Sequence, residues 1–295
     1  MKGIIVAAGY GTRFLPVTKT IAKEMLPLVT IPSIQFIVDE FLSSGITDIV
    51  IITSRRKKAL EDYFDREIEM EEIFKREGKV DALARITPPK ASIAFVRQQE
   101  MMGTGHALLQ VKCWIGNEPC VVAYPDDLHF GSVPLAAQLV ETYKKTGSSV
   151  MASIRVDGDV SRYGVLDVGE DGERVRAIVE KPASGMEPAP SNPELGHDVS
   201  IGRYLFTSEF FDLLEEGWLD HLAQAEKEGK RPGEYFHIYA LNRLMEAGRV
   251  VHRHADGQRL DTGEPAGYLE AILRYADTQP ELRPVLDAFI ANRSV

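Results

Sequence analysis

The feature that most constrains this chain is an apolar segment near its N-terminus that runs directly into a loop of small residues. Ile4, Ile5 and Val6 form the apolar segment, and residues 7–11 read Ala-Ala-Gly-Tyr-Gly. Short, continuously apolar runs are typical of buried parallel strands. Small residues let a backbone approach a bulky ligand, and successive exposed N–H groups can hold phosphate oxygens. The segment therefore predicts a strand of an α/β sheet with a phosphate-binding loop at its carboxyl end.

Basic residues behind the loop support this prediction. Arg13 follows the loop and Lys23 comes shortly after, where the charge of a polyphosphate would lie. The spacing excludes a P-loop, because no Gly-x-x-x-x-Gly-Lys-Ser/Thr is present, and Phe14 or Leu15 stands where the dinucleotide motif needs its third glycine. The segment favours a nucleotide loop of a third kind. The alternative is a tight turn followed by solvated basic residues.

Apolar runs alternate with amphipathic stretches through the first half of the chain, which predicts a mostly parallel sheet with helices on both faces. Little room is left for helices between the strands expected from Arg162 onward, so an added, partly antiparallel β region is expected there. The expected strands are Gly3–Val6, Asp48–Thr53, Ser92–Arg97, Cys120–Tyr124, Val150–Val156, Val165–Val168, Val175–Val179, Ser200–Phe206 and Arg249–His254. The expected helices are Ser33–Ser44, Lys57–Phe64, His106–Lys112, Leu135–Lys145, Ser208–Glu215, Leu219–Glu228, Glu234–Glu246, Glu264–Thr278 and Glu281–Asn292.

Two segments are expected on the surface. Arg66–Arg85 is densely charged and predicts an exposed helical insertion. Pro182–His197 contains several prolines and predicts a surface loop within a domain.

Composition excludes several classes of protein. The 295 residues are 44% hydrophobic and 26% charged, which allows one large α/β domain or two small ones. A net charge of −10 argues against a nucleic-acid partner, because duplex binding needs a basic face. No signal peptide precedes the first strand and no apolar run reaches the ~20 residues of a membrane span, so a cytoplasmic protein is expected. Cys113 and Cys120 lack disulfide or metal-ligand spacing and are expected to be reduced thiols.

Carboxylates follow two of the apolar segments. Asp126 and Asp127 come after one, and Asp261 follows Leu260 in another. Ligands of open α/β sheets bind at the carboxyl ends of strands, and Mg²⁺ prefers carboxylate oxygens together with phosphates and water. The two strand ends could therefore bracket one metal ion; the alternative is that each aspartate caps a turn. The pair Glu180-Lys181, taken alone, is a solvated salt bridge at a strand end.

Sequence blocks along nearly the whole chain carry a family resemblance. They are Lys2–Pro16, Lys19–Pro27, Phe95–Glu100, Gly103–Ala107, Tyr124–Leu128, Ser161–Val165, Val179–Pro182, Ile201–Tyr204, Leu260–Gly263 and Gly267–Leu269. In these blocks the chain resembles the bacterial UTP–glucose-1-phosphate uridylyltransferases (UDP-glucose pyrophosphorylases), within the wider sugar-1-phosphate nucleotidyltransferases.

The resemblance implies a Rossmann-like, three-layer α/β fold of the glycosyltransferase-A type, with a mixed, mostly parallel central sheet and a small extra β region. It implies a single nucleotidyltransferase domain over residues 1–295. Residues 1–130 would form its nucleotide-binding half, residues 131–280 its sugar-phosphate-binding half, and residues 281–295 a C-terminal helix.

The resemblance also implies roles for individual residues. Asp126 and Asp261 match metal-binding positions, and Arg13, Lys23 and Lys181 match catalytic positions. Nucleotide contacts would fall on Ala8, Gly9, Gly11 and Thr12, on Glu24 at the ribose, and on Gln98 and Gly103 at the pyrimidine edge. Contacts to the sugar phosphate would fall on Gly164, Glu180, Lys181 and Gly202.

The implied reaction is Mg²⁺-dependent attack of glucose 1-phosphate on the α-phosphorus of UTP, giving UDP-glucose and pyrophosphate. No general base is needed, because the nucleophile is already an anion; positioning and charge neutralisation do the work. The implied partners are these small molecules, with neither nucleic acid nor membrane, in a homodimer or homotetramer.

One block departs from the family. After Gly233-Glu234 the family continues Ile-Gln-Leu-Thr-Asp, whereas this chain has Tyr235-Phe-His-Ile-Tyr239. The sequence predicts that this block shapes the sugar side of the pocket or an interface beside it; the alternative is a repacked helix start. Two other functions stay open: a nucleotidyltransferase for another sugar or base, and a non-catalytic regulatory paralogue. The joint presence of Arg13, Lys23, Asp126, Lys181 and Asp261 counts against the paralogue.

Overall fold

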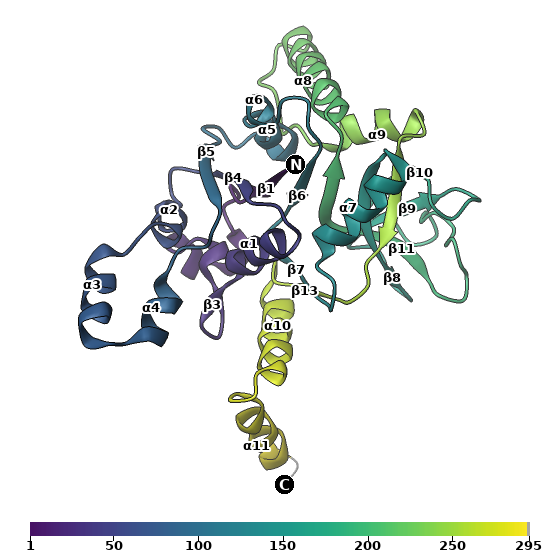
Figure 1. Ribbon diagram of the computed structural model, residues 1–295. Coiled ribbons are helices and arrows are strands. Elements are labelled where there is room, and N and C mark those ends of the chain that lie inside the picture. The colour runs from purple at the N-terminus through teal and green to yellow at the C-terminus, as the bar shows by residue number, and fades with distance from the viewer. Residues whose placement is uncertain (294–295) are drawn as a thin grey trace.

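The computed structural model describes residues 1–293, and its centre is one large mixed β-sheet (Figure 1). The strands of this sheet are β1 (Lys2–Val6), β4 (Asp48–Thr53), β5 (Ser92–Arg97), β6 (Cys120–Ala123), β8 (Ser149–Val156), β9 (Gly164–Val168), β10 (Val175–Glu180), β11 (His197–Phe206) and β12 (Val250–His254). Their order is β10-β9-β11-β6-β1-β4-β5, with β8 paired to β11 and β12 paired to β8.

Helices cover both faces of this sheet. They are α1 (Ser33–Ser43), α2 (Lys58–Phe64), α5 (Gly103–Leu109), α6 (Lys112–Ile115), α7 (Leu135–Thr146), α8 (Glu209–Lys227), α9 (Ile238–Glu246) and α10 (Pro265–Thr278). Successive strand residues point to opposite faces. Ile5 and Ile51 therefore enter a core shared with α1, α2, α7 and α10, whereas Ile4 and Val50 enter a second core shared with α5, α8 and α9. The three-layer α/β prediction is confirmed.

The two halves of the sheet differ in strand direction. Strands β6, β1, β4 and β5 are parallel neighbours, as the continuous apolar runs predicted. Strand β11 runs antiparallel to β6, β8 and β9, and β10 runs antiparallel to β9. The expected extra β region is therefore present.

Two small sheets lie beside the large one. Strand β2 (Pro27–Leu28) pairs with β3 (Ile31–Pro32), and β7 (Asp127–Phe130) pairs with β13 (Gln258–Asp261). The sequence analysis did not predict β2, β3 and β7, because they are short and make no long apolar run, whereas β13 is the apolar segment expected before Asp261.

Several helices stand away from the sheet. The charged insertion forms α3 (Ile68–Glu77) and α4 (Val80–Ile86) at one edge of Figure 1, as predicted. Helix α11 (Arg283–Arg293) continues beyond α10, away from the sheet, and residues 294–295 of the predicted C-terminal helix lie outside the described residues. The surface loop that was predicted at Pro182–His197 lies between β10 and β11, and β11 begins at its last residue. Among the described helices, none combines the length and apolar character needed to cross a bilayer.

Helices α8, α5 and α9 differ most from their predicted bounds. Helix α8 is continuous where two helices were expected, and Gly217 in its middle lies against a tyrosine ring, since a Cβ there would lie 2.2 Å from Cδ1 of Tyr239. Helix α5 begins at Gly103 instead of His106. Helix α9 begins at Ile238 instead of Glu234, because the backbone of Tyr235 hydrogen-bonds to Met102 and Gly105.

The strand order reverses direction at β1. Strand β4 lies on one side of β1 and β6 on the other, and both run parallel to it. Such a reversal leaves a crevice at the carboxyl ends of the two strands, which is where open α/β sheets bind ligands. The loop after Val6 and the turn after Ala123 meet at this crevice.

Candidate active site

The loop after β1 has the open backbone expected of a phosphate loop. A Cβ on Gly9 would meet no atom within 4 Å, so the space above this residue is free. Gly11 has a φ of 68°, a left-handed conformation that favours glycine, and its carbonyl accepts a hydrogen bond from Oγ1 of Thr18 at 2.8 Å. Ala8 is buried, whereas Thr12 and Arg13 are exposed beside the crevice.

Lys23 and Asp126 form an ion pair across the crevice. Lys23 lies in a short 3-10 helix (Lys23–Met25), and its Nζ is 2.5 Å from Oδ2 of Asp126. Burial alone would lower the pKa of Lys23, but the Asp126 carboxylate outweighs it and raises this pKa. Burial alone would raise the pKa of Asp126, but the Lys23 ammonium lowers it below its ordinary value. Both groups are therefore charged at neutral pH.

Asp261 is brought to the same point from β13. A Cβ on Gly263 would lie 3.1 Å from both Oδ2 of Asp126 and Oδ1 of Asp261, so the two carboxylates flank this glycine. The backbone holds them there: Thr262 N donates to Asp126 O and Gly263 N donates to Asp261 Oδ1, each at 2.8 Å. The arrangement brings together the two carboxylates that the sequence predicted as metal ligands.

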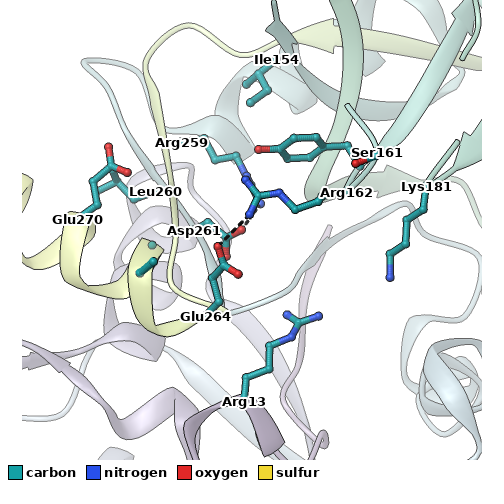
Figure 2. Close-up of a pocket in the computed structure, with 13 residues that line it drawn as sticks. Arg13, Ile154, Ser161, Arg162, Lys181, Arg259, Leu260, Asp261, Glu264 and Glu270 are labelled. Carbon is teal, nitrogen blue, oxygen red and sulfur yellow. Dashed lines mark hydrogen bonds and ion pairs between the residues drawn. The ribbon is translucent and has the colours of Figure 1, made fainter. Parts of the chain in front are cut away.

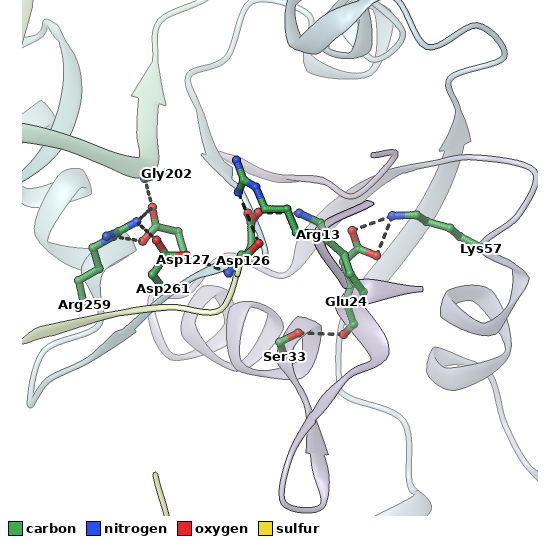
Figure 3. Close-up of polar contacts among 11 residues, drawn as sticks. Arg13, Glu24, Ser33, Lys57, Asp126, Asp127, Gly202, Arg259 and Asp261 are labelled. Atoms are coloured by element: carbon green, nitrogen blue, oxygen red, sulfur yellow. Dashed lines mark hydrogen bonds and ion pairs between the residues drawn. The ribbon is translucent and has the colours of Figure 1, made fainter. Parts of the chain in front are cut away.

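Arg259 is a residue of the site that the sequence analysis missed. Its Nε donates to Asp127 Oδ1 at 2.5 Å, and its Nη2 lies 3.2 Å from Asp261 Oδ2 (Figure 3). Gly202 N donates to the other oxygen of Asp127 at 2.7 Å. Asp127 is therefore committed to Arg259 and Gly202, which leaves Asp126 to face Lys23. The sequence did hold a signal for Arg259: it lies two residues before Asp261, and side chains two residues apart in a strand point to the same face.

Lys57 is a second residue that the sequence analysis missed. Its Nζ lies 2.7 Å from both carboxylate oxygens of Glu24, and the two side chains are only 5% and 1% exposed (Figure 3). Burial lowers the pKa of Lys57 despite this partner. The predicted contact of Glu24 with a ribose stays a prediction; the structure shows that this carboxylate neutralises a buried cation next to Lys23.

A cavity of about 680 Å³ opens on the side of the crevice where the sugar phosphate is predicted to bind. Arg13 and Lys181 point toward its open space from different elements, and Asp261 lies between Arg259 and Glu264 on its wall (Figure 2). Arg162 also lines it and pairs with Glu264 at 3.3 Å. Three carboxylates line the same space (Asp261, Glu264 and Glu270), and Arg162 and Arg259 pair with carboxylates. Arg13 and Lys181 are therefore the cations that point into the open space, where an anionic ligand would meet them.

Lys181 has an unusual backbone. Its φ is 47°, in the left-handed region, and its N–H donates to Tyr163 O at 2.9 Å. Strained residues of this kind cluster at functional sites. Gly164 and Glu180 lie together, since a Cβ on Gly164 would be 2.9 Å from Oε1 of Glu180. These three predicted sugar-phosphate residues therefore form one group beside the cavity.

Gln98 and Gly103 also lie together, at another edge of the site. Gln98 is buried, and its Nε2 donates to Gly103 O at 3.1 Å. Tyr10 of the β1 loop and residues 100–102 line one hollow of about 660 Å³. The segment between the two predicted base-reading residues thus shares a hollow with the loop after β1.

The block Tyr235–Tyr239 packs against the loop that carries Gly103, since Tyr235 N donates to Met102 O at 2.7 Å and Gly105 N donates to Tyr235 O at 2.9 Å. Its expected place on the sugar side or at an interface stays a prediction. The block packs on the predicted base-reading loop. Its place follows from the contact of α9 with α8, which the sequence pattern does not encode.

The donor set of the site fits a hard divalent cation. Two carboxylates flank one point, and Asp126 is ionised. Among residues 1–293 no group of three or more Asp, Glu, His or Cys could hold a metal by itself. Such a two-carboxylate site matches Mg²⁺, which takes one or two carboxylates together with waters and substrate phosphates.

Comparison with known proteins agrees with this geometry. The nucleotidyl transferase family model matches residues 2–278. The chain belongs to the nucleotidyl transferase family. Within this family it groups with the UTP–glucose-1-phosphate uridylyltransferases: that of Staphylococcus epidermidis is 41% identical over 100% of this chain and 98% of its own. That of Staphylococcus haemolyticus is 39% identical over 98% and 96%. The chain is thus a nucleotidyltransferase by family.

Solved structures show the same fold. A UTP-bound UDP-glucose pyrophosphorylase from Acinetobacter baumannii superposes with a TM-score of 0.83 at 30% identity, covering 98% of each chain. A UDP-glucose pyrophosphorylase complexed with UDP-glucose has a TM-score of 0.76 at 35% identity, covering 94% of this chain and 99% of its own.

Proposed function

We propose that this chain transfers the uridylyl group of UTP to glucose 1-phosphate, giving UDP-glucose and pyrophosphate with Mg²⁺ as cofactor. The observation that carries the proposal is the Lys23–Asp126 pair at the strand-order reversal, with Asp261 opposite and the small-residue loop beside it. The UTP-bound and UDP-glucose-bound relatives support the choice of nucleotide and sugar.

The reaction is an in-line displacement at the α-phosphorus of UTP. A phosphate oxygen of glucose 1-phosphate forms the new P–O bond, while the bond from the α-phosphorus to the bridging oxygen breaks and pyrophosphate leaves with that electron pair. Arg13 and Lys23 neutralise the charge that develops on the α-phosphate and leaving group, and Lys181 holds the attacking phosphate. Asp126 and Asp261 would hold Mg²⁺, which supplies charge neutralisation on the phosphate oxygens.

Pyrophosphate release across a panel of nucleotides and sugar 1-phosphates tests the proposal. UTP with glucose 1-phosphate should give the highest kcat/KM. Lys23→Ala should lower kcat by roughly two orders of magnitude or more without unfolding the protein, because contacts to developing charge supply about that much. Lys58→Ala, which removes an exposed lysine of α2, is the matched control and should keep the wild-type rate. Equal rates for Lys23→Ala and wild type would contradict the assignment.

A sugar-1-phosphate nucleotidyltransferase for another base is the second candidate. The observation that favours it is the packing of the altered block on the Gly103 loop. Location in the cytoplasm and assembly into a dimer or tetramer remain part of the proposal.

A further inference from the structure

Residues 234–237 form a strap across the loop that carries Gly103. The strap holds this loop through its backbone, from Tyr235 N to Met102 O at 2.7 Å and from Gly105 N to Tyr235 O at 2.9 Å. Tyr235 is itself anchored, since it is 4% exposed and its hydroxyl donates to Leu214 O at 2.8 Å. The strap is therefore held in place by Tyr235, and the Gly103 loop packs against it.

Two glycines allow the close approach. A Cβ on Gly103 would lie 2.5 Å from Tyr235 O, and one on Gly105 would lie 2.8 Å from the carbonyl carbon of Phe236. Gly103 also has a φ of 89°, which side chains rarely adopt. The loop has no room to shift toward the strap, so a change in the strap must move the loop.

His237 ties the end of the strap to the same loop. Its Nδ1 lies 2.9 Å from Oγ1 of Thr104 and 3.4 Å from the hydroxyl of Tyr124, and its backbone N–H donates to Oγ1 of Thr104 at 3.4 Å. The hydroxyl of Thr104 can donate to Nδ1 or accept from it, depending on the tautomer, whereas Nε2 is buried without a hydrogen-bond partner among the described residues. Burial lowers the pKa of His237 to about 4, so the ring is neutral at pH 7. A leucine, which the family pattern has at this position, keeps the backbone N–H but makes neither of the two hydrogen bonds of the ring.

The loop in turn holds the residue expected to read the base. Gln98 Nε2 donates to Gly103 O at 3.1 Å and lies 3.1 Å from His106 Nδ1. Tyr10 of the phosphate loop and Met102 line the same hollow. Contacts therefore run from His237 through Thr104 and Gly103 to Gln98, beside the loop that would hold the phosphates.

We infer that His237 is a positioning residue that sets selectivity for the nucleobase by fixing the Met102–Gly105 loop through Thr104. The inference rests on the proposed function for the identity of the nucleotide. On this inference, the residues of this block that differ from the family pattern affect selectivity for the base. Selectivity for the sugar depends on other residues, around Gly164 and Lys181.

The test compares His237→Leu, His237→Asn and Thr104→Val with wild type. Each is assayed for kcat/KM with UTP against CTP and dTTP, and with glucose 1-phosphate against galactose 1-phosphate. His237→Leu should lower the UTP-to-CTP ratio by about fivefold to tenfold, raise the KM for UTP, and leave the sugar ratio unchanged. His237→Asn should recover most of the ratio, because its amide oxygen can take the place of Nδ1. Thr104→Val should match His237→Leu, and the double variant should add no further loss.

Tyr239→Phe is the control from the same block. Its hydroxyl faces Asp220 at 3.1 Å, away from the loop, so both ratios should stay at wild-type values. A changed sugar ratio with a constant base ratio would overturn the inference, as would an equal loss of kcat/KM with every substrate. If His237→Leu does not fold, Thr104→Val decides alone. If wild type turns over no UTP, the proposed function fails, and dissociation constants of UTP and CTP in the same variants still decide the inference.

Discussion

Replacing Lys57 by methionine is expected to leave the buried carboxylate of Glu24 without its cation, next to Lys23, the lysine proposed to be catalytic. Lys57 is 5% exposed and Glu24 1% exposed, and two 2.7 Å contacts join them. Methionine keeps most of the apolar length and removes the ammonium. The Glu24 carboxylate then stays buried without a cation, in a position where water does not replace the lost partner.

The expected cost follows from this burial. Removing one partner of a buried ion pair typically costs about 3–5 kcal/mol, against a total stability of about 5–15 kcal/mol. Activity should fall as well, because the Glu24 charge already acts on Lys23 and would then compete with Asp126 for its ammonium. Urea unfolding measures the first effect and pyrophosphate release the second.

Two further variants make the test decisive. Lys58→Met removes the neighbouring exposed lysine and should change stability by less than about 0.5 kcal/mol. Lys57→Met combined with Glu24→Gln removes both charges, and should recover most of the lost stability, since the buried charge is gone. A loss below 1 kcal/mol in Lys57→Met, or a double variant as unstable as the single one, would refute the reasoning.

Other predictions address the metal, the pH dependence and the core. Chelation by EDTA should abolish pyrophosphate release and added Mg²⁺ should restore it; undiminished turnover would exclude the role of the two carboxylates. Asp126→Asn should raise the Mg²⁺ concentration for half-maximal rate by at least about tenfold in a protein that still folds; early unfolding with a normal rate would make Asp126 a turn residue. His237 has a native pKa of about 4, below the ~6.5 of an unfolded chain. The unfolded state therefore takes up the proton first, and stability falls from about pH 6.5 toward 4 by up to about 1.4 kcal/mol per unit; urea titrations should show a shallower fall in His237→Leu. Arg203→Met should cost about 3–5 kcal/mol in the same assay, because Glu40 loses contacts of 2.8 and 2.9 Å inside the core; a loss under 1 kcal/mol would contradict this.

Local signals were sufficient for most of the sheet and for the centre of the site. Strands such as Asp48–Thr53 and Ser92–Arg97 match the structure at both ends, because an apolar run between breakers specifies a buried strand with few alternatives. Asp126 was placed correctly at a strand end for the same reason. Helix bounds around Gly217 and Glu234 were wrong, because packing partners from other segments decided them.

The sequence by itself determined the fold class, the small-residue loop after β1 and the strand ends that carry Asp126 and Asp261, because short-range apolar patterns and small residues act within a few positions of each other. Only the tertiary structure decided which charges meet. Lys57 reaches Glu24, Arg259 reaches Asp127 and the Tyr235 strap reaches Met102 across long stretches of chain. Crossovers in the sheet bring loops that are distant in sequence to the carboxyl ends of its strands. Polar groups that become buried there are paired with one another, and this pairing sets the contacts.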